Sequence, residues 1–393
     1  RQYANGTNTS SHFATVSSGD TVQFAFDADT GVMWSGLNNT WTGAEPSTGN
    51  SPSYTGIDAS KGYVPMTGSY GSNNYNKVNF GQQGFSYTPP TGYSSLSTNN
   101  LPPNVPSIVR PQRHFETIIW SGNGTNGRVI TDLEFQPDFV WIKCRSNDPS
   151  HKWFDVIRGG GKVLESDDSS AEETNQEYGY LSAFNTNGFT LTQGTHGSFP
   201  MGNVNHSGRT YVAWCWKAGG SGVSNSDGTI TSSVSANTEA GFSVVTWTGS
   251  GADASIGHGL GKKPHVIFVK NRSAGDNWRV WWRNVTIGDE YALVLNDTTG
   301  VYTGSDKWYN SPNGNDTTTT TFGVSDDGST NRSGESFVGY CWAEIPGYSK
   351  FGTYTGSGNA TDGPFVHTGF RVGWLMTKRS SSARNWIIYD NKR

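Results

Sequence analysis

Residues 266–282 read VIFVKNRSAGDNWRVWW, and this stretch decides the fold. An apolar run, a short polar turn and an aromatic run predict a β-hairpin. The pattern recurs at residues 139–156, FVWIKCRSNDPSHKWFDV, and at residues 374–389, WLMTKRSSSARNWIIY. All three copies keep an Arg-Ser pair, at Arg145, Arg272 and Arg379, and a following Trp. The chain is therefore a tandem array of one repeat.

Other landmarks keep the same spacing in each copy. Residues 207–216, SGRTYVAWCW, match residues 333–342, SGESFVGYCW. Three pairs of landmarks are each 15 residues apart, namely Gly122 and Pro137, Gly249 and Pro264, and Gly356 and Arg371. We expect a first unit at residues 1–104, repeat 1 at 113–218, a Gly/Ser-rich linker at 219–239, repeat 2 at 240–347 and a partial repeat 3 at 348–393. The third copy stops before any equivalent of the Tyr-Cys-Trp strand, so we expect the array to continue.

The composition favours strands and turns. Of the 393 residues, 33% are hydrophobic and 13% aromatic, and 51 are glycine. Aromatic and β-branched residues suit pleated strands, whereas Gly and Asn suit turns. We therefore expect an all-β chain of tandem antiparallel β-sandwich modules, jelly-roll or lectin-like. A formal charge of -4 argues against a nucleic-acid partner. The sequence has no apolar run long enough to span a membrane, so we expect no membrane insertion.

Residues 1–104 have their own pattern. Residues 18–27, SGDTVQFAFD, alternate like a half-buried strand and lead through residues 28–31 to a return strand. Residues 63–66 and 77–81 are expected to supply two more strands. The Gly-Asp strand, the Asp-x-Asp-x-Gly hairpin, the Tyr-x-Pro strand and the Asn-Phe-Gly strand resemble the second half of a SPRY domain, an antiparallel β-sandwich that binds partners through its loops. We expect this unit to lack its amino-terminal part.

The chain shows no motif of known catalytic or metal chemistry. Asp27 and Asp29 begin like a calcium loop, but the later bidentate acid is absent, so we expect a hairpin turn. His258 and His265 have no third zinc ligand at a typical spacing. Acids such as Asp155 have no counterpart in the other copies, which argues against a carboxylate pair for glycoside hydrolysis. We expect no catalytic residues, no metal and no cofactor.

Several residues have a structural interpretation. Cys144, Cys215 and Cys341 are expected in the core rather than in disulfides. The acidic, Ser-rich residues 165–173 are expected to form a solvated loop. The repeated arginines are expected to anchor their hairpins by binding backbone carbonyls or by packing over the neighbouring Trp.

The tandem arrangement, a SPRY-like unit followed by repeats with Trp-Cys-Trp strands and the GHGLG turn at 257–261, resembles tail-fibre and other virion proteins of tailed, especially marine, bacteriophages. The resemblance implies a non-enzymatic protein located in the virion, at the particle surface or tail. Its expected partners are a host-surface glycan or receptor and other virion proteins, and it can form a homo-oligomer. The leading hypothesis is host attachment. The alternatives are a structural or decorating virion protein whose repeats bind other virion chains, and a polysaccharide depolymerase.

The aromatic hairpin suggests where a glycan would bind. If Trp278, Val280 and Trp282 face the core, alternation places Trp281 on the solvent side between Arg279 and Arg283, where its ring could stack on a sugar. Comparable candidate residues are Trp308, Tyr309, Trp34 and Trp41. The alternative is that these rings fill the core or a contact with a neighbouring module or subunit.

Overall fold

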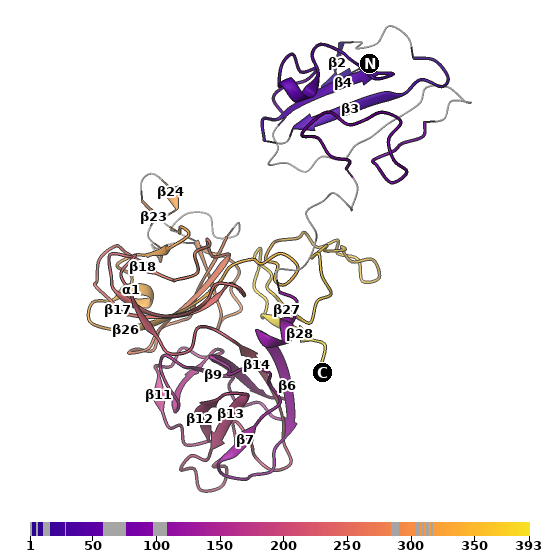
Figure 1. The fold of residues 1–393 in the computed structure, drawn as a ribbon. Coiled ribbons are helices and arrows are strands. Elements are labelled where there is room, and N and C mark those ends of the chain that lie inside the picture. Colours follow the sequence, from indigo (N-terminus) through magenta and orange to yellow (C-terminus); the bar gives the residue numbers. More distant parts are fainter. Residues whose placement is uncertain are drawn as a thin grey trace. The chain divides into compact units, whose positions relative to one another are not determined.

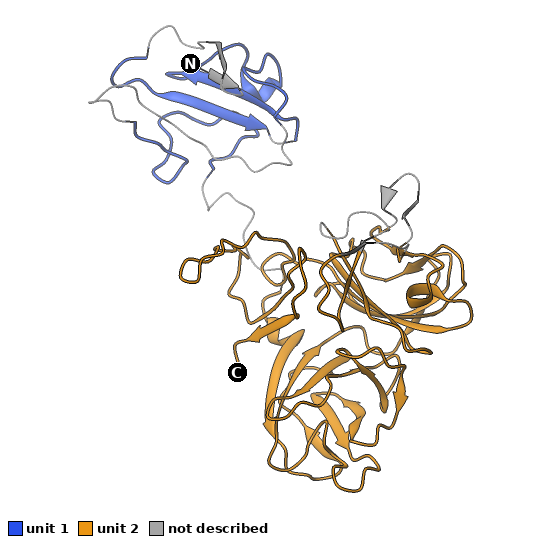
Figure 2. Ribbon diagram, turned by 180° about the vertical axis from the view of Figure 1, so that it is seen from behind, with its two compact units in different colours: residues 1–104 blue, residues 105–393 orange. Residues whose placement is uncertain are grey.

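The computed structural model divides the chain into two compact units, residues 1–104 and 105–393, coloured separately in Figure 2. Every pair of named strands is antiparallel, so the all-β prediction is confirmed. Helical structure in the described residues is limited to α1 (Gly328–Asn331) and two 3-10 turns, Pro46–Thr48 and Pro111–Arg113. The structure describes residues 2–4, 7–10, 16–27, 29–57, 76–96, 108–283, 291–303, 307–308, 310–311, 314–315 and 317–393.

The first unit contains the predicted hairpin. Its strands are β1 (Gln2–Ala4), β2 (Thr7–Ser10), β3 (Val22–Asp27), β4 (Val32–Leu37) and β5 (Thr40–Trp41), with β1 paired to β2 and β3, β4 and β5 forming one sheet. The Asp27 carboxylate closes the β3–β4 turn by accepting hydrogen bonds from Asp29 N at 2.9 Å and Thr30 Oγ1 at 2.6 Å. The acidic side chain thus serves the turn, as expected. In the described part of the chain, no three His, Cys, Asp or Glu side chains are grouped to hold a metal.

The strand predicted at residues 77–81 is wrong. These residues form a turn in which Asn79 Oδ1 accepts from Gly81 N at 2.9 Å and Gln82 Oε1 accepts from Phe80 N at 2.7 Å. Side-chain amides that bind nearby backbone groups compete with sheet pairing, which explains the turn. The strand predicted at residues 63–66 lies outside the described residues.

Repeat 1 is a sandwich of two sheets (Figure 1). The larger sheet has the order β11-β10-β9-β8-β14-β6, with the bounds Glu173–Thr174, Lys162–Glu165, Lys152–Asp155, Phe139–Cys144, Thr210–Trp216 and Phe115–Ser121. The smaller sheet has the order β12-β13-β7, with the bounds Tyr180–Asn185, Gly188–Thr192 and Arg128–Ile130. An apolar core that includes Val140, Phe154 and Phe189 fills the space between them.

Repeat 2 has the same strand order in its large sheet, extended by two strands. The order is β15-β16-β17-β26-β19-β20-β21-β22, with the bounds Val223–Asn225, Ser232–Asn237, Phe242–Thr248, Ser336–Trp342, Val266–Asn271, Arg279–Trp282, Tyr291–Val294 and Tyr302–Thr303. The second layer pairs β18 (Ala254–Gly257) with β25 (Thr321–Val324), and a separate pair joins β23 (Asn310–Ser311) to β24 (Gly314–Asn315).

The stretch expected to be a linker, residues 219–239, contributes all of β15 and β16 to the repeat 2 sheet. Its entry is fixed by Asp138, whose Oδ2 accepts from Ala218 N at 2.8 Å and from Gly220 N at 3.2 Å. Gly219 N also donates to Ser235 Oγ at 2.9 Å. These hydrogen bonds order a segment whose composition suggested flexibility.

The third copy supplies the hairpin of β27 (Trp374–Thr377) and β28 (Ile387–Asp390). The register is the same in the three hairpins: Trp141 pairs with Trp153 in repeat 1, Phe268 with Val280 in repeat 2, and Met376 with Ile388 in repeat 3. Positions in the three repeats can therefore be compared residue by residue.

The large sheets are buried on both faces. In β8 and β19 nearly every residue is buried, so their apolar runs do not alternate with polar residues. One face of each sheet covers the interior of its own sandwich, and the other face enters a cluster shared between repeats. Two-sided burial is the reason that these strands read as continuous apolar runs. The three cysteines are buried and free, as predicted.

Candidate functional site

The aromatic residues proposed to face solvent lie inside the protein. Trp281 is 2% exposed and Trp308 is 3% exposed, and both belong to the interior core of repeat 2, with Ile267 and Phe322. The prediction that Trp281 lies on the solvent side is wrong. The prediction assumed that only one face of the hairpin is buried, whereas both faces are buried.

The other candidate residues are dispersed. Arg279 donates from Nε to Ser329 Oγ at 2.9 Å, and Arg283 lies with a guanidinium nitrogen 3.4 Å from His265 Nε2. Trp34, in the first unit, is 1% exposed and donates to Asn50 O at 2.8 Å, while Trp41 is half-buried. Tyr309 lies outside the described residues. The described candidates form no common aromatic surface.

The rings of the hairpins instead meet between repeats. The Trp153 ring lies 4.6 Å from the Trp278 ring, 4.9 Å from the Tyr340 ring and 5.9 Å from the Phe268 ring, measured between centroids. Trp153 belongs to repeat 1 and the other three residues to repeat 2. Aromatic pairs at these distances each contribute about 0.5–1.5 kcal/mol beyond the burial of their surface. The outer sheet faces of the two repeats therefore bind each other.

The third hairpin joins the same aromatic cluster. The Trp374 ring lies 5.5 Å from the Trp216 ring of repeat 1, and the Trp386 ring lies 6.3 Å from the Phe268 ring of repeat 2. Each of the three repeats thus contacts the other two within residues 105–393.

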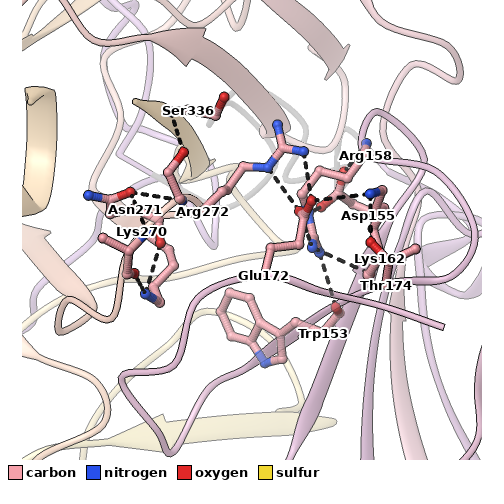
Figure 3. A network of polar contacts seen from close by, with 12 residues as sticks. Trp153, Asp155, Arg158, Lys162, Glu172, Thr174, Lys270, Asn271, Arg272 and Ser336 are labelled. Carbon is pink, nitrogen blue, oxygen red and sulfur yellow. Dashed lines mark hydrogen bonds and ion pairs between the residues drawn. The ribbon is translucent and has the colours of Figure 1, made fainter. Parts of the chain in front are cut away.

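A buried polar cluster accompanies the aromatic contact between repeats 1 and 2 (Figure 3). The Arg158 side chain is fully buried and donates to Asp155 Oδ2, to Trp153 O at 3.0 Å and to Tyr340 OH at 3.2 Å. The Tyr340 hydroxyl donates in turn to Asp155 Oδ2 at 2.7 Å. A hydroxyl of repeat 2 is therefore held by an ion pair of repeat 1.

Burial and neighbouring charges fix the protonation states of this cluster. Burial opposes the charge on Arg158, but Asp155, Tyr340 and Glu172 together outweigh it, so the pKa of Arg158 is raised. Burial also raises the pKa of Tyr340 well above its usual value, so the phenol stays neutral. The buried centre of the cluster therefore holds a charged guanidinium beside a neutral phenol.

Glu172 links the two repeats through a bidentate ion pair. Its carboxylate accepts from Arg272 Nε at 2.9 Å and from another Arg272 nitrogen at 3.0 Å, and from Arg158 at 3.2 Å (Figure 3). Burial alone would raise the pKa of Glu172, but the hydrogen bond from Arg272 and the charge of Arg158 bring it below its usual value. The expectation of a solvated loop at residues 165–173 is wrong, because this loop carries the contact between repeats.

The repeated arginines have three different environments. Arg272 binds the Glu172 carboxylate, and not a carbonyl or a Trp face as expected. Arg379 donates to Ser382 Oγ at 3.2 Å, and Arg145 is exposed. Counted along the strands, Arg379 corresponds to Cys144 rather than to Arg145, because the third hairpin is one residue shorter before its Arg-Ser pair.

Backbone contacts between repeats 1 and 2 recur between repeats 2 and 3. Trp278 Nε1 donates to Glu165 O at 2.7 Å, and Lys270 Nζ donates to Ser169 O at 3.0 Å. In the same positions, Trp386 Nε1 donates to Val294 O at 2.8 Å and Lys378 Nζ donates to Thr298 O at 2.7 Å. A third hydrogen bond is also repeated, from Glu172 N to Arg272 O at 2.9 Å and from Val301 N to Ser380 O at 2.8 Å.

The Asp-Arg pair of repeat 1 also has a copy in repeat 3. Asp390 and Arg393 correspond to Asp155 and Arg158, and Arg393 Nε donates to Asp390 Oδ2 at 2.6 Å. Trp214 of repeat 1, at the position of Tyr340, donates to the same Asp390 oxygen at 3.1 Å. Sequence reasoning missed this pair by treating Asp155 as unrepeated. The D-x-x-R spacing at 155–158 and 390–393 was the available signal.

One surface depression of repeat 2 lies beside this interface. Its lining includes Ser224, Thr231, Thr246, Trp247 and Arg272. The Arg272 guanidinium in this lining is already bound by Glu172.

A family model described as Domain of unknown function (DUF7483) matches residues 110–393, more than half of the chain. The chain belongs to this family. The DUF7483 region contains both complete repeats, the third hairpin and all of the contacts between them. No curated protein and no solved structure matches the chain. No helix in the described residues is long and apolar enough to cross a membrane.

Proposed function

We propose that the chain is a non-enzymatic structural component of a phage virion, in which the DUF7483 repeats form a rigid body that binds other virion chains. The observation that carries this proposal is the burial of the hairpin aromatic faces against neighbouring repeats, as for Trp153 against Trp278 at 4.6 Å. The phage assignment rests on the resemblance of the repeat motifs to tail-fibre and virion proteins.

The geometry favours this function over host attachment through the aromatic hairpin. A sugar-binding ring must present a face to solvent, but Trp281 and Trp308 belong to the interior core of repeat 2. The same residue types instead make the contacts between modules. A protein built in this way is suited to holding a fixed shape within an assembly.

The geometry also favours a structural role over a depolymerase. The carboxylate and guanidinium groups of Asp155 and Arg158 are fully buried in the interface, and Tyr340 is bound to both. A catalytic carboxylate must reach its substrate, whereas these groups are closed to one. Their arrangement stabilises the contact between repeats 1 and 2.

Immunogold labelling tests the proposal directly. An antibody raised against the chain is expected to label purified particles of the phage that encodes it, at a regular position. Absence of labelling on intact and on detergent-opened particles would overturn the proposal. Selective retention on a glycan array would favour attachment instead, and release of reducing ends from host polysaccharide would favour a depolymerase. Near-UV circular dichroism would show that the chain is folded in each assay.

A further inference from the structure

The contact of repeat 1 with repeat 2 and the contact of repeat 2 with repeat 3 are made by equivalent residues. A strand-and-loop segment of one repeat, residues 162–172 or 291–301, lies against the hairpin of the next. The receiving hairpin uses a Lys to bind a carbonyl of the loop and a ring N–H to bind a carbonyl of the strand. These groups are Lys270 with Trp278, and Lys378 with Trp386.

The hairpin of repeat 1 has equivalent receiving groups, and within the described part of the chain no strand-and-loop segment binds them. In strand register, Lys143, Arg145 and His151 stand where Lys270, Arg272 and Trp278 stand in repeat 2. Lys143 Nζ donates to Asp148 Oδ1 and Pro149 O, both at 3.3 Å and both in its own turn. Arg145 is exposed.

His151 can replace the tryptophan N–H of the other two hairpins. Its ring lies 6.3 Å from the Trp141 ring, on the outer face of the sheet. Burial lowers the pKa of His151 to about 3, so its imidazole is neutral at pH 7 and keeps one N–H to donate.

The third hairpin ends with residues equivalent to those that precede the strand-and-loop segment of repeat 1. Asp390 and Arg393 are already arranged as Asp155 and Arg158 are, with Arg393 N donating to Asp390 Oδ1 at 3.1 Å and Arg158 N donating to Asp155 Oδ1 at 2.9 Å. In repeat 1, strand β10 begins four residues after Arg158 and pairs with β9. Strand β28 holds the position of β9, and among the described residues its one strand partner is β27.

The two hairpins meet in one depression. Its lining is Lys143, Arg145, Ile388, Tyr389, Asp390 and Arg393. We propose that this depression is the docking site of a third strand-and-loop segment, of the same length and acidic character as residues 162–172. Its strand pairs with β28, its carbonyls bind Lys143 and His151, and a carboxylate binds Arg145.

Charge and exposure agree with this occupant. Lys143, Arg145 and Arg393 outnumber the one acid of the lining, Asp390, so the depression is basic. Residues 165–173 contain five acidic side chains, Glu165, Asp167, Asp168, Glu172 and Glu173. Of these, Glu172 binds Arg272 of the neighbouring repeat. Leu375 and Tyr389 are exposed, whereas Val140 and Phe154, at the same positions of repeat 1, are buried. The inner face of the third hairpin is therefore exposed where the inner face of the repeat 1 hairpin is covered.

A second folded copy of this chain fits less well. Both of its segments of this kind, residues 162–172 and 291–301, are already bound to their own neighbouring hairpins. An edge strand such as β28 can accept an added strand along its open side.

The test extends the full chain after Arg393 with a copy of residues 159–174, GGGKVLESDDSSAEET, which places each residue at its repeat 1 spacing. We expect hydrogen exchange of the β28 amides to slow by at least about tenfold. A scrambled extension of the same composition is expected to give no protection. Exchange at β28 that does not change, or that slows equally with the scrambled extension, would overturn the proposal.

Substitutions in the extended chain test the site itself. Arg145→Gln is expected to remove most of the gain in protection, whereas Arg371→Gln, at another exposed arginine, is expected to leave it. An equal gain with and without Arg145→Gln would overturn the proposed carboxylate contact. Sedimentation of the unextended chain tests whether a second copy occupies the depression. A concentration-dependent dimer with protected β28 amides would assign the depression to a second copy and overturn the proposal.

Discussion

Replacing Glu172 by Gln isolates the contribution of the ion pairs between repeats 1 and 2. The side chain is 10% exposed and its carboxylate is shared by Arg158 and Arg272. Breaking a buried ion pair by removing one partner costs about 3–5 kcal/mol. Because Arg158 keeps Asp155 and Gln keeps one acceptor oxygen, we expect a loss of about 2–3 kcal/mol, below that range.

The matched control is Glu134→Gln. Glu134 also pairs with two arginines, Arg110 at 2.5 Å and Arg113 at 3.4 Å, but its side chain is 44% exposed. Exposed ion pairs contribute roughly 0–1 kcal/mol, so we expect this variant to lose less than about 1 kcal/mol. The chemistry of the substitution is identical, and only the burial differs.

The assay is urea unfolding of the full chain, followed by tryptophan fluorescence. Residues 1–104 form a separate compact unit, so any transition of their own should not move and serves as an internal reference. A double-mutant cycle with Arg272→Gln should give a coupling free energy of at least about 1 kcal/mol. Equal losses in Glu172→Gln and Glu134→Gln, or a coupling near zero, would refute the reasoning.

The acid dependence of this contact has a definite sign. The pKa of Glu172 is lower in the folded chain than in the unfolded chain, so its contribution is present above the unfolded value of about 4.5 and is lost as pH falls through the folded value. Glu172→Gln should therefore reduce the loss of stability on acidification below about pH 4.5.

Three further predictions concern other parts of the chain. Gly31 has φ of +67° and an added Cβ would lie 2.2 Å from Ile57 O, so Gly31→Ala should lower the melting temperature of the first unit, and should do so more than Gly49→Ala, where φ is +71° and nothing lies within 4 Å. Burial lowers the pKa of His258 from 6.5 to about 4. The contribution of the neutral side chain to the free energy of unfolding should therefore be fully present above about pH 6.5, and up to about 3 kcal/mol should be lost as the pH falls towards 4. Urea midpoints of the chain and of His258→Gln across this range would show the difference, and parallel curves would contradict the prediction. The three cysteines are buried and free, so a thiol reagent should label them only after unfolding, and rapid labelling of the folded chain would place them at the surface instead.

The sequence by itself determined the repeat, the three hairpins and the all-β class. These features are local or periodic: an apolar run, a turn and an aromatic run specify a hairpin wherever they occur, and equal spacing of landmarks reveals the copies. The buried cysteines followed for the same reason, because they lie within apolar strands. The hairpin turn at Asp27 followed from its turn residues.

Only the tertiary structure decided which faces are covered and by what. Alternation states that Trp278 and Trp282 share one face of the hairpin and Trp281 the other, but it contains no information on which face meets solvent. Here both faces are buried, one by the second layer of repeat 2 and one by the neighbouring repeats. The pairing of Glu172 with Arg272, 100 residues apart in the chain, likewise depends on how the two sandwiches pack, and no local sequence pattern encodes that contact.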